Sequence, residues 1–489
     1  MLYQLSYLAS GGIVSTERVG LCAGWGVVVA GLGSVPAMTS ATDQVLAKLS
    51  DDGAGAEVLA AMRRRLEQLA DPNAGMLPGE QLEPVPELPA LEDLPDDERA
   101  RETLGRIAVV KLNGGLGTSM GLRLPKSLVE VKPERSFLDI VALQVLHLRE
   151  RHGVRLPLVL MNSFSTREAS LAALDRHAGI RADVPVDFLQ SREPKLLADT
   201  LAPATWPADP ELEWCPPGHG DMYVSLAGSG MLGALLDAGY RWAFVSNIDN
   251  LGATLEPRIA AWAEAESVPF VLEAVRGTAA DRKGGHLASR DGQLVLRESA
   301  QVPDGDDSFG DVERWRYYNT NNLWVDLEAL RRLLDERPSG PDLPLIVNRK
   351  TVDPADESSP AVLQLESAMG AAVGSIEGAR AVHVPRTRFA PVKTTDDLLV
   401  VRSDAWELGD DGRLAPTFDG KPPVVTLDRD HYKRVDQLDA HFAAGPPSLR
   451  RCRRLEVQGE VDFGADVVVE GEVELRGPAR VGDGERLSG

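Results

Sequence analysis

Short apolar runs alternate with amphipathic segments from residue 107 to about residue 401. Apolar runs of a few residues bounded by turn residues are typical of buried strands, and apolar positions every three to four residues indicate helices. The expected strands are residues 107–110, 156–161, 186–189, 242–246, 270–273 and 381–383, and the expected helices include residues 137–152, 165–178 and 255–266. This alternation predicts a mostly parallel sheet with helices on both faces, which binds ligands at the carboxyl ends of its strands.

The pattern differs before this region. Residues 41–69 show helical spacing interrupted at Asp51-Asp52-Gly53, which predicts two short helices. Residues 71–97 are rich in Pro and Glu and predict a linker on the surface. Residues 19–37 are apolar and glycine-rich and stand ahead of Met38. For residues 1–37 we expect a disordered extension or a mis-assigned start in preference to a secretion signal.

The pattern changes again near the end of the sequence. Short strands there are punctuated by glycines about six residues apart, at Gly459, Gly464, Gly471 and Gly477. This rhythm is typical of a parallel β-helix, and a plain β-meander fits the same period. We therefore expect an extension (1–37), a helical segment with a linker (38–100), a catalytic domain (101–400) and a C-terminal β-helix domain (401–489).

The composition limits the classes of molecule that the protein is expected to bind. The 489 residues carry a net charge of −22, which argues against nucleic acid and anionic membrane surfaces and leaves small phosphorylated substrates open. The cysteines, Cys22, Cys215 and Cys452, are far apart and lack CxxC spacing, so we expect a reduced, cytoplasmic protein without a disulfide framework.

A glycine-rich segment, Lys111-Leu-Asn-Gly-Gly-Leu-Gly-Thr-Ser-Met-Gly121, follows the first expected strand, with Pro125-Lys126-Ser127 and a short strand signal behind it. Glycines let backbone N–H groups approach phosphate oxygens closely, and a lysine adds positive charge. The spacing of Gly115, Gly117 and Gly121 fits neither the dinucleotide fingerprint nor the P-loop. A hairpin loop without a ligand is the alternative.

Two further segments carry polar groups suited to a nucleotide site. Asn247 and Asp249 end the apolar run at residues 242–246, where a carboxylate suits Mg²⁺ and a helix N-cap is the alternative. His219 lies between two glycines in a loop that Pro216-Pro217 restrains, which favours contact with a ligand.

Amides and cations follow later in the sequence. The run Asn319-Thr-Asn-Asn322 offers amides that read sugar hydroxyls, or forms an Asn-rich turn. The segment Pro385-Arg-Thr-Arg-Phe-Ala-Pro-Val-Lys393 concentrates cations that meet phosphate or lie on the surface. No Ser/His/Asp or Cys/His nucleophile pattern stands out, so the consistent chemistry is phosphoryl or nucleotidyl transfer by positioning and charge neutralisation.

Seven motifs in order resemble one enzyme family. They are Lys111-Leu-Asn-Gly-Gly-Leu-Gly-Thr-Ser-Met-Gly121 with Pro125-Lys-Ser127, Leu160-Met-Asn-Ser-Phe164, Phe188-Leu-Gln-Ser191, Pro216-Pro-Gly-His-Gly-Asp221, Ser246-Asn-Ile-Asp-Asn-Leu-Gly-Ala253, Asn319-Thr-Asn-Asn-Leu-Trp324 and Phe389-Ala-Pro-Val-Lys393. Over roughly residues 103–475 the chain resembles the UTP–glucose-1-phosphate uridylyltransferase family of the eukaryotic type.

The resemblance implies an α/β fold. The implied architecture is a Rossmann-like (GT-A-like) mixed sheet with helices on both faces and a C-terminal left-handed parallel β-helix. The implied reaction joins UTP and glucose 1-phosphate to give UDP-glucose and pyrophosphate with Mg²⁺. The C-terminal β-helix is also the expected surface for a homo-oligomer, although the tail after Gly477 lacks the further coils of many relatives.

The resemblance also implies roles for individual residues. The expected nucleotide-binding residues are Leu112, Asn113, Gly114, Gly115, Lys126, Gln190, Gly218, Asn247, Ile248, Asp249 and Lys393. The expected sugar-phosphate contacts are Gly115, His219, Asn247, Glu273 and Asn321, with the choice of asparagine in the run left open. Asp249 is the expected Mg²⁺ ligand, Gln190 the reader of the uracil edge, and Lys126 and Lys393 the catalytic lysines.

Two alternatives stay open. A related pyrophosphorylase for another sugar 1-phosphate usually carries Arg in the glycine loop, where this chain has Thr118-Ser119-Met120. A non-catalytic nucleotide-sugar sensor would be expected to lack Lys126, Asp249 or Lys393, and all three are present.

Overall fold

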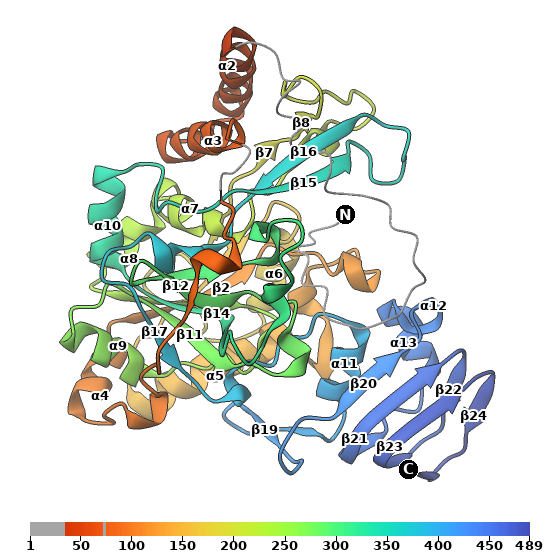
Figure 1. The fold of residues 1–489 in the computed structure, drawn as a ribbon. Coiled ribbons are helices and arrows are strands. Elements are labelled where there is room, and N and C mark those ends of the chain that lie inside the picture. Colours follow the sequence, from red (N-terminus) through yellow and green to blue (C-terminus); the bar gives the residue numbers. More distant parts are fainter. Residues whose placement is uncertain (1–34, 72–74) are drawn as a thin grey trace.

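The computed structural model describes residues 35–71 and 75–489, and a ten-stranded mixed sheet forms its centre (Figure 1). The main path of the sheet is β1-β12-β14-β10-β2-β5-β6, with β11, β13 and β17 attached. The strands are β1 (Glu83–Pro84), β2 (Ile107–Asn113), β5 (Leu158–Asn162), β6 (Asp187–Leu189), β10 (Trp242–Asn247), β11 (Phe270–Arg276), β12 (His286–Arg290), β13 (Gln293–Arg297), β14 (Tyr317–Asp326) and β17 (Arg380–His383). The six strands expected from the apolar runs all lie in this sheet.

The sheet is less parallel than the pattern predicts. Strands β10, β2, β5 and β6 run parallel, as do β11 and β17. β14, however, pairs antiparallel with both β10 and β11, and β12 pairs antiparallel with β1, β13 and β14. β14 is buried along its whole length, so its residues do not show the one-sided alternation by which antiparallel strands are usually recognised.

Helices cover both faces of this sheet, as expected. Alternate residues of a strand point to opposite faces, and Ile107 and Val109 of β2 lie in one core while Ala108 and Val110 lie in the other. The helices contributing to the first core are α5 (Phe137–His152), α6 (Arg167–Leu174), α9 (Pro257–Ala265) and α11 (Thr395–Arg402), and those contributing to the second are α7 (Met222–Gly228), α8 (Met231–Asp237) and α10 (Leu327–Glu336). The bounds of α5 are those that the sequence predicts, because a Ser136 capping box starts it and Gly153 ends it in the left-handed region.

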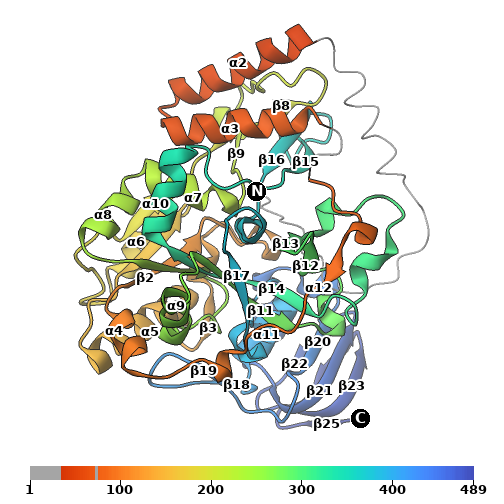
Figure 2. The same cartoon turned by 60° about the vertical axis from the view of Figure 1, so that its left-hand side comes forward.

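The two predicted N-terminal helices are α2 (Val35–Asp51) and α3 (Ala56–Leu69), which lie side by side above a small sheet (Figure 2). That sheet has the order β15 (Ile346–Thr351), β16 (Ala361–Glu366), β8 (Leu196–Leu197), and it shares an apolar core with both helices. The expected extension falls almost wholly on residues 1–34, outside the described part of the chain.

The expected surface linker packs more closely than its composition suggests. Leu82, Val85, Leu91 and Leu94 are buried, and β1 within this segment joins the edge of the central sheet. The described part of this proline-rich segment has no regular structure longer than β1 and two short 3-10 turns, but the apolar residues between the prolines still enter cores.

From residue 424 onward, the C-terminal strands pair only in parallel within their sheets. The order of one sheet is β20 (Val424–Leu427), β21 (Ser448–Gln458), β23 (Val468–Arg476), β25 (Arg486–Ser488), and that of the other is β22 (Val461–Phe463), β24 (Ala479–Val481). A β-meander, whose strands are antiparallel, is therefore wrong for this region. The buried residues of these strands belong to the same core as α5 and α11 of the central region.

Short strands complete the fold. They are β3 (Glu130–Lys132), β4 (Arg135–Ser136), β7 (Glu193–Pro194), β9 (Trp214–Cys215), β18 (Trp406–Leu408) and β19 (Leu414–Pro416). Along residues 35–71 and 75–489, no helix has both the length and the hydropathy that crossing a membrane requires.

Candidate functional site

Two neighbouring parallel strands bring the glycine-rich loop and Asp249 to one edge of the sheet. β2 and β10 pair in a register that sets Leu112 opposite Asn247. Just beyond, Ile248 N donates to Leu112 O at 3.2 Å. The side chain of Ile248 is buried in the core, so only its backbone is available at the site.

The glycine-rich loop folds back on itself and brings Lys126 beside its start. Lys126 N donates to Gly115 O at 3.1 Å, and Leu116 forms an isolated bridge with Pro125. A Cβ on Gly115 would meet no atom within 4 Å, so this glycine faces open space. A Cβ on Gly114 would lie 2.3 Å from Gln190 Oε1, so Gly114 is needed where the loop packs on the Gln190 amide.

Lys126 and Asp249 form an ion pair between Nζ and Oδ2, with their side chains 17% and 14% exposed. The second carboxylate oxygen, Oδ1, is buried and has no hydrogen-bond partner among the described residues. The helix N-cap alternative for Asn247 and Asp249 is wrong, because the next helix is α9, whose N-cap is Glu256.

Lys393 is brought close to the Lys126–Asp249 pair by the segment that precedes it. Val392 N donates to Asp249 O at 3.2 Å, and Asn250 bridges Pro391. Burial lowers the pKa of Lys393, while the negative charges of Asp249 and Asp397 act in the opposite direction. The site therefore holds Lys126, Asp249 and Lys393 within electrostatic reach of one another.

His219 lies in a single 3-10 turn, His219–Asp221, beside this cluster. Burial, and then the charge of Lys393, lower its pKa to about 4, so the ring is neutral near pH 7. Met369 N donates to Nδ1 at 2.9 Å, which leaves Nε2 carrying the proton. The imidazole is thus a neutral hydrogen-bond donor.

Asn113 and Gln190 are joined through β5. Asn113 Nδ2 donates to Asn162 Oδ1 at 2.7 Å and to Ser170 Oγ at 2.8 Å. Gln190 N donates to Asn162 O at 2.8 Å. The Asn113 Nδ2 group is therefore engaged inside the protein, whereas its buried Oδ1 has no hydrogen-bond partner among the described residues. Gln190 is anchored by its backbone, with its amide beside Gly114.

Glu273 is fully buried and its carboxylate accepts four hydrogen bonds from protein donors. Oε1 accepts from Trp324 Nε1 at 2.9 Å and Arg388 Nη2 at 2.6 Å, and Oε2 accepts from Asn322 Nδ2 at 3.0 Å and Arg388 Nε at 2.8 Å. A carboxylate has about four lone-pair positions, so these four contacts use its full acceptor capacity.

The asparagine run is part of strand β14, and the turn alternative is wrong. Asn321 has a left-handed φ of +58°, and its side chain accepts from Asn319 Nδ2 at 2.8 Å. Asn322 contacts Glu273, so of these two asparagines only Asn322 is hydrogen-bonded to it.

Sequence reasoning missed the roles of Arg388 and Asn250. Arg388 belongs to the cationic segment, but it is buried against Glu273 and is neither a surface charge nor aimed at the Lys126–Asp249 pair. Asn250 Nδ2 donates to Asn322 Oδ1 at 3.2 Å and Arg388 O at 3.1 Å, while its Oδ1 accepts from Ala390 N at 3.0 Å. These contacts hold the chain that leads to Lys393. The one hint of this role in the sequence is that Asn250 directly follows Asp249 in the motif of residues 246–253.

Two lysines and a carboxylate at this edge of a mixed α/β sheet can neutralise phosphate charge, and a neutral histidine donor stands next to them. That chemistry, on this fold, is that of a nucleotidyltransferase. Comparisons with known proteins identify the family of nucleotidyltransferases to which the chain belongs.

A family model described as UTP–glucose-1-phosphate uridylyltransferase matches residues 62–470. A probable UTP–glucose-1-phosphate uridylyltransferase from Schizosaccharomyces pombe is 39% identical over 76% of this chain and 74% of its own length. The Hordeum vulgare enzyme of that name is 37% identical over 83% of each chain. A crystal structure of a Leishmania major UDP-glucose pyrophosphorylase variant in complex with UDP-glucose superposes with a TM-score of 0.86 and 41% identity, covering 92% of this chain and 98% of that one. The chain belongs to the UTP–glucose-1-phosphate uridylyltransferase family.

Proposed function

We propose that the chain joins UTP and glucose 1-phosphate to give UDP-glucose and pyrophosphate at the edge of the sheet where β2 and β10 end. The observation that carries this proposal is the meeting of Lys126, Asp249 and Lys393 beside the glycine-rich loop, in a chain of this family. The sensor alternative finds no support, because the charged groups of the reaction stand together.

The nucleotide lies along the glycine-rich loop in this proposal. Leu112 and Asn113 end β2 beneath the nucleotide, the backbone N–H groups of Gly114 and Gly115 face its phosphates, and the open space at Gly115 leaves room for them. Gln190 reads the uracil edge with its amide, and Gly218 supports the base by close packing. The amide of Gln190, which both donates and accepts, suits an imide edge.

The glucose 1-phosphate lies on the side of His219, Asn247 and β14. The neutral His219 Nε2–H donates to a sugar-phosphate oxygen, and Asn247 offers its amide. Asn321 is the proposed sugar contact from β14. Glu273 is also a proposed contact. Because its four acceptor positions are filled by protein donors, a sugar hydroxyl that donates to Glu273 would take the place of one of these donors.

Divalent metal use is typical of this family, and we propose Mg²⁺ held by Asp249. The described residues contain no group of three or more His, Cys, Asp or Glu that would form a protein-only cage. The buried Asp249 Oδ1 without a hydrogen-bond partner fits an ion that takes one carboxylate and completes its shell with phosphate oxygens and water. Bound there, the ion would supply further neutralisation of phosphate charge.

The reaction then needs positioning more than proton transfer. A phosphate oxygen of glucose 1-phosphate attacks the α-phosphorus of UTP, the bond to the β-phosphate breaks, and pyrophosphate leaves. Lys393 and Lys126 stabilise the charge that develops on the transferring phosphate, and His219 orients the attacking group. No covalent enzyme intermediate is required.

The role of Asp249 is tested by metal dependence. We expect Asp249→Asn to raise the Mg²⁺ concentration for half-maximal activity at least tenfold, on the scale of one lost charge contact of about 1.4 kcal/mol. Asp419→Asn, at an exposed position, serves as the control. An unchanged Mg²⁺ requirement in a folded Asp249→Asn protein would remove Asp249 from the metal site.

We further propose that the parallel C-terminal strands wind as a left-handed β-helix, that this unit mediates a homo-oligomer, and that the protein works in the cytoplasm. Repeated parallel pairing and the regular glycines support the first part. Two buried free thiols, Cys215 and Cys452, are consistent with a reducing compartment. Light scattering during size-exclusion chromatography of the full chain tests the oligomer.

A further inference from the structure

Helix α3 sends one charged side chain, Arg65, into the protein interior. Arg65 is 8% exposed and makes an ion pair with Glu193 of β7, which is 2% exposed. Burying two charges is costly, and separating them would leave each one uncompensated away from water. Arg65 and Glu193 are therefore held to each other, and a movement of α3 has to carry β7 with it.

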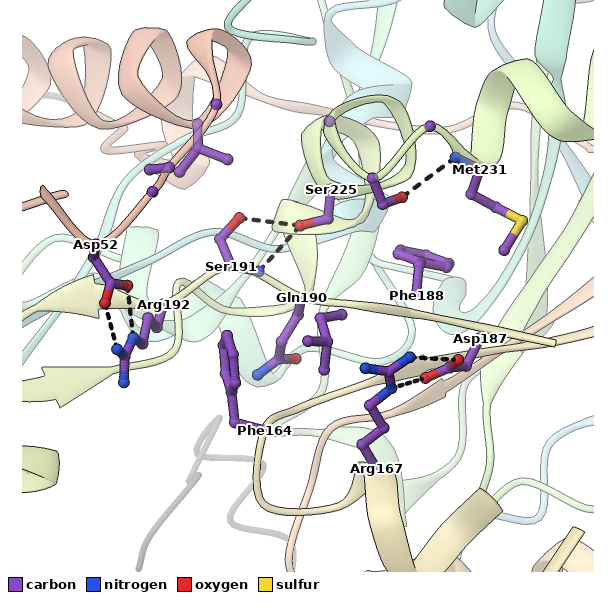
Figure 3. Close-up of a pocket in the computed structure, with 18 of the residues that line it drawn as sticks. Asp52, Phe164, Arg167, Asp187, Phe188, Gln190, Ser191, Arg192, Ser225 and Met231 are labelled. Carbon is purple, nitrogen blue, oxygen red and sulfur yellow. Dashed lines mark hydrogen bonds and ion pairs between the residues drawn. The ribbon is translucent and has the colours of Figure 1, made fainter. Parts of the chain in front are cut away.

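Glu193 ends a four-residue segment that begins with Gln190, the proposed reader of uracil. Within this segment, Arg192 pairs with Asp52 in the turn between α2 and α3, with Nε 2.8 Å from Oδ2 (Figure 3). A cleft of about 480 Å³ lies between this turn and the segment, with Gln190 and Ser191 on its wall. The N-terminal helices and the turn between them thus contact the segment through Arg192, which also lines the cleft, and through Glu193.

Arg65 also reaches the second segment proposed to surround the base. Its Nη2 donates to Ser367 Oγ at 3.4 Å. Ser367 carries the loop that contains Gly218 and His219, because Ser367 N donates to Pro217 O at 3.1 Å and Ser367 O accepts from Gly220 N at 2.8 Å.

Ser367 packs tightly against this loop, with no room for an added side-chain atom at either glycine. A Cβ on Gly218 would lie 2.6 Å from Ser367 O, and one on Gly220 would lie 2.4 Å from Ser367 Oγ. A displacement of Ser367 is therefore passed to the loop directly. One guanidinium, that of Arg65, touches the supports of both segments.

We propose that Arg65 is a positioning residue that fixes Gln190 and the Gly218 loop relative to each other, so that the N-terminal helices set the affinity for the base of UTP. This inference rests on the proposed function, in which those two segments surround uracil. Arg65 acts through Glu193 and Ser367. Because both segments are held in place before binding, less conformational entropy is lost when UTP binds, and its affinity is higher.

The test compares neighbouring arginines of α3. Arg65→Met combined with Glu193→Gln removes both members of the buried pair together, although the buried carboxyl groups of Asp221 and Glu366 then lose a nearby positive charge. Arg64→Met removes a surface ion pair whose members, Arg64 and Asp342, are 37% and 42% exposed. For each protein, KM for UTP, KM for glucose 1-phosphate, kcat and the inhibition constant of inorganic tripolyphosphate are measured.

We expect the double variant to raise KM for UTP about tenfold or more, with kcat and KM for glucose 1-phosphate within about twofold of wild type. Tripolyphosphate has no base, so its inhibition constant should stay within about twofold. Arg64→Met should change none of these values, and Arg65→Lys, which keeps a charge for Glu193, should fall between wild type and the double variant.

Three results would overturn the inference: an unchanged KM for UTP, equal weakening of UTP and tripolyphosphate, or a loss confined to kcat. If the double variant does not fold, Ser367→Ala provides the same comparison, with KM for UTP expected to rise about threefold and tripolyphosphate inhibition unchanged. A wild-type protein that does not turn over UTP defeats the proposed function itself. An active wild type whose Arg65 variants keep their affinity for UTP defeats this inference alone.

Discussion

Lys393 is the residue on which the chemistry of the site depends most. Its ammonium group is largely withdrawn from water, close to both Asp249 and Lys126, where a fixed charge acts strongly on a phosphate transition state. We expect Lys393→Ala to lower kcat about 10²–10³-fold, the scale of removing one such stabilising group, while the melting temperature stays close to that of wild type. Steady-state kinetics with circular dichroism check this.

Lys421→Ala, at an exposed lysine, is the control for loss of a positive charge. Near-normal turnover by a folded Lys393→Ala protein would contradict the role of Lys393.

Glu366 should make stability depend on pH. Burial raises its pKa from 4.5 to about 7, against opposing contributions from Asn348, Lys350 and Arg65. Between these values the folded protein keeps a proton that the unfolded chain has lost, so the free energy of unfolding falls as pH rises, by about 1.4 kcal/mol per unit.

Glu366→Gln keeps the acceptor for Asn348 and removes this titration. We expect the variant to match wild type near pH 4 and to exceed it by about 2–3 kcal/mol at pH 8, measured by urea unfolding across pH. Glu357→Gln, at an exposed glutamate, should follow wild type throughout. Parallel stability curves for Glu366→Gln and wild type would show that Glu366 does not titrate in this range.

At the scale of elements, the loop that carries His219 depends on Gly218. Its φ of 75° and ψ of 171° belong to a region that is almost exclusive to glycine, and Ser367 O blocks a Cβ there. We expect Gly218→Ala to lower the melting temperature and raise KM for UTP several-fold, because the loop must shift off Ser367.

Gly292→Ala separates backbone strain from contact. Gly292 has a φ of +79° in the β12–β13 turn, and a Cβ there meets nothing within 4 Å. This variant should cost about 1–2 kcal/mol of stability and leave KM for UTP unchanged. If Gly218→Ala and Gly292→Ala have the same KM for UTP, the close packing of Gly218 against Ser367 has no part in nucleotide binding.

The same scale shows what the sequence could predict. Strands and helices with strong apolar periods, such as β2, β10 and α5, were found close to their bounds, since pattern and caps act locally. Strand β14 was not predicted, neither its existence nor its antiparallel direction, and the burial of Arg388 was missed, because both depend on partners distant in sequence, β10 and Glu273. The motifs located Lys126, Asp249 and Lys393, but their meeting depends on the strand register.

At the scale of the molecule, the C-terminal strands are joined to the central region by a continuous core. Buried Tyr432 strengthens this connection: its carbonyl accepts from Thr395 Oγ1 of α11 at 2.6 Å, and its hydroxyl donates to Val461 O at 2.7 Å. We therefore expect a single thermal transition for both parts, with equal calorimetric and van't Hoff enthalpies.

Hydrogen exchange resolved by segment checks the same point. Amides of β21 and β23 should be protected to about the same free energy as those of β2 and β10. An earlier, separate melting of residues 448–489 while catalysis persists would show that the C-terminal strands form an independent unit.

The central claim is tested most directly by pyrophosphate release from UTP and Mg²⁺ with purified protein. Glucose 1-phosphate is compared with N-acetylglucosamine 1-phosphate and galactose 1-phosphate at matched concentrations. The account predicts rapid release that depends on glucose 1-phosphate and is much slower with the other two sugars. Release with another sugar phosphate only would contradict the substrate assignment, and no release with any of them would contradict the proposed catalysis.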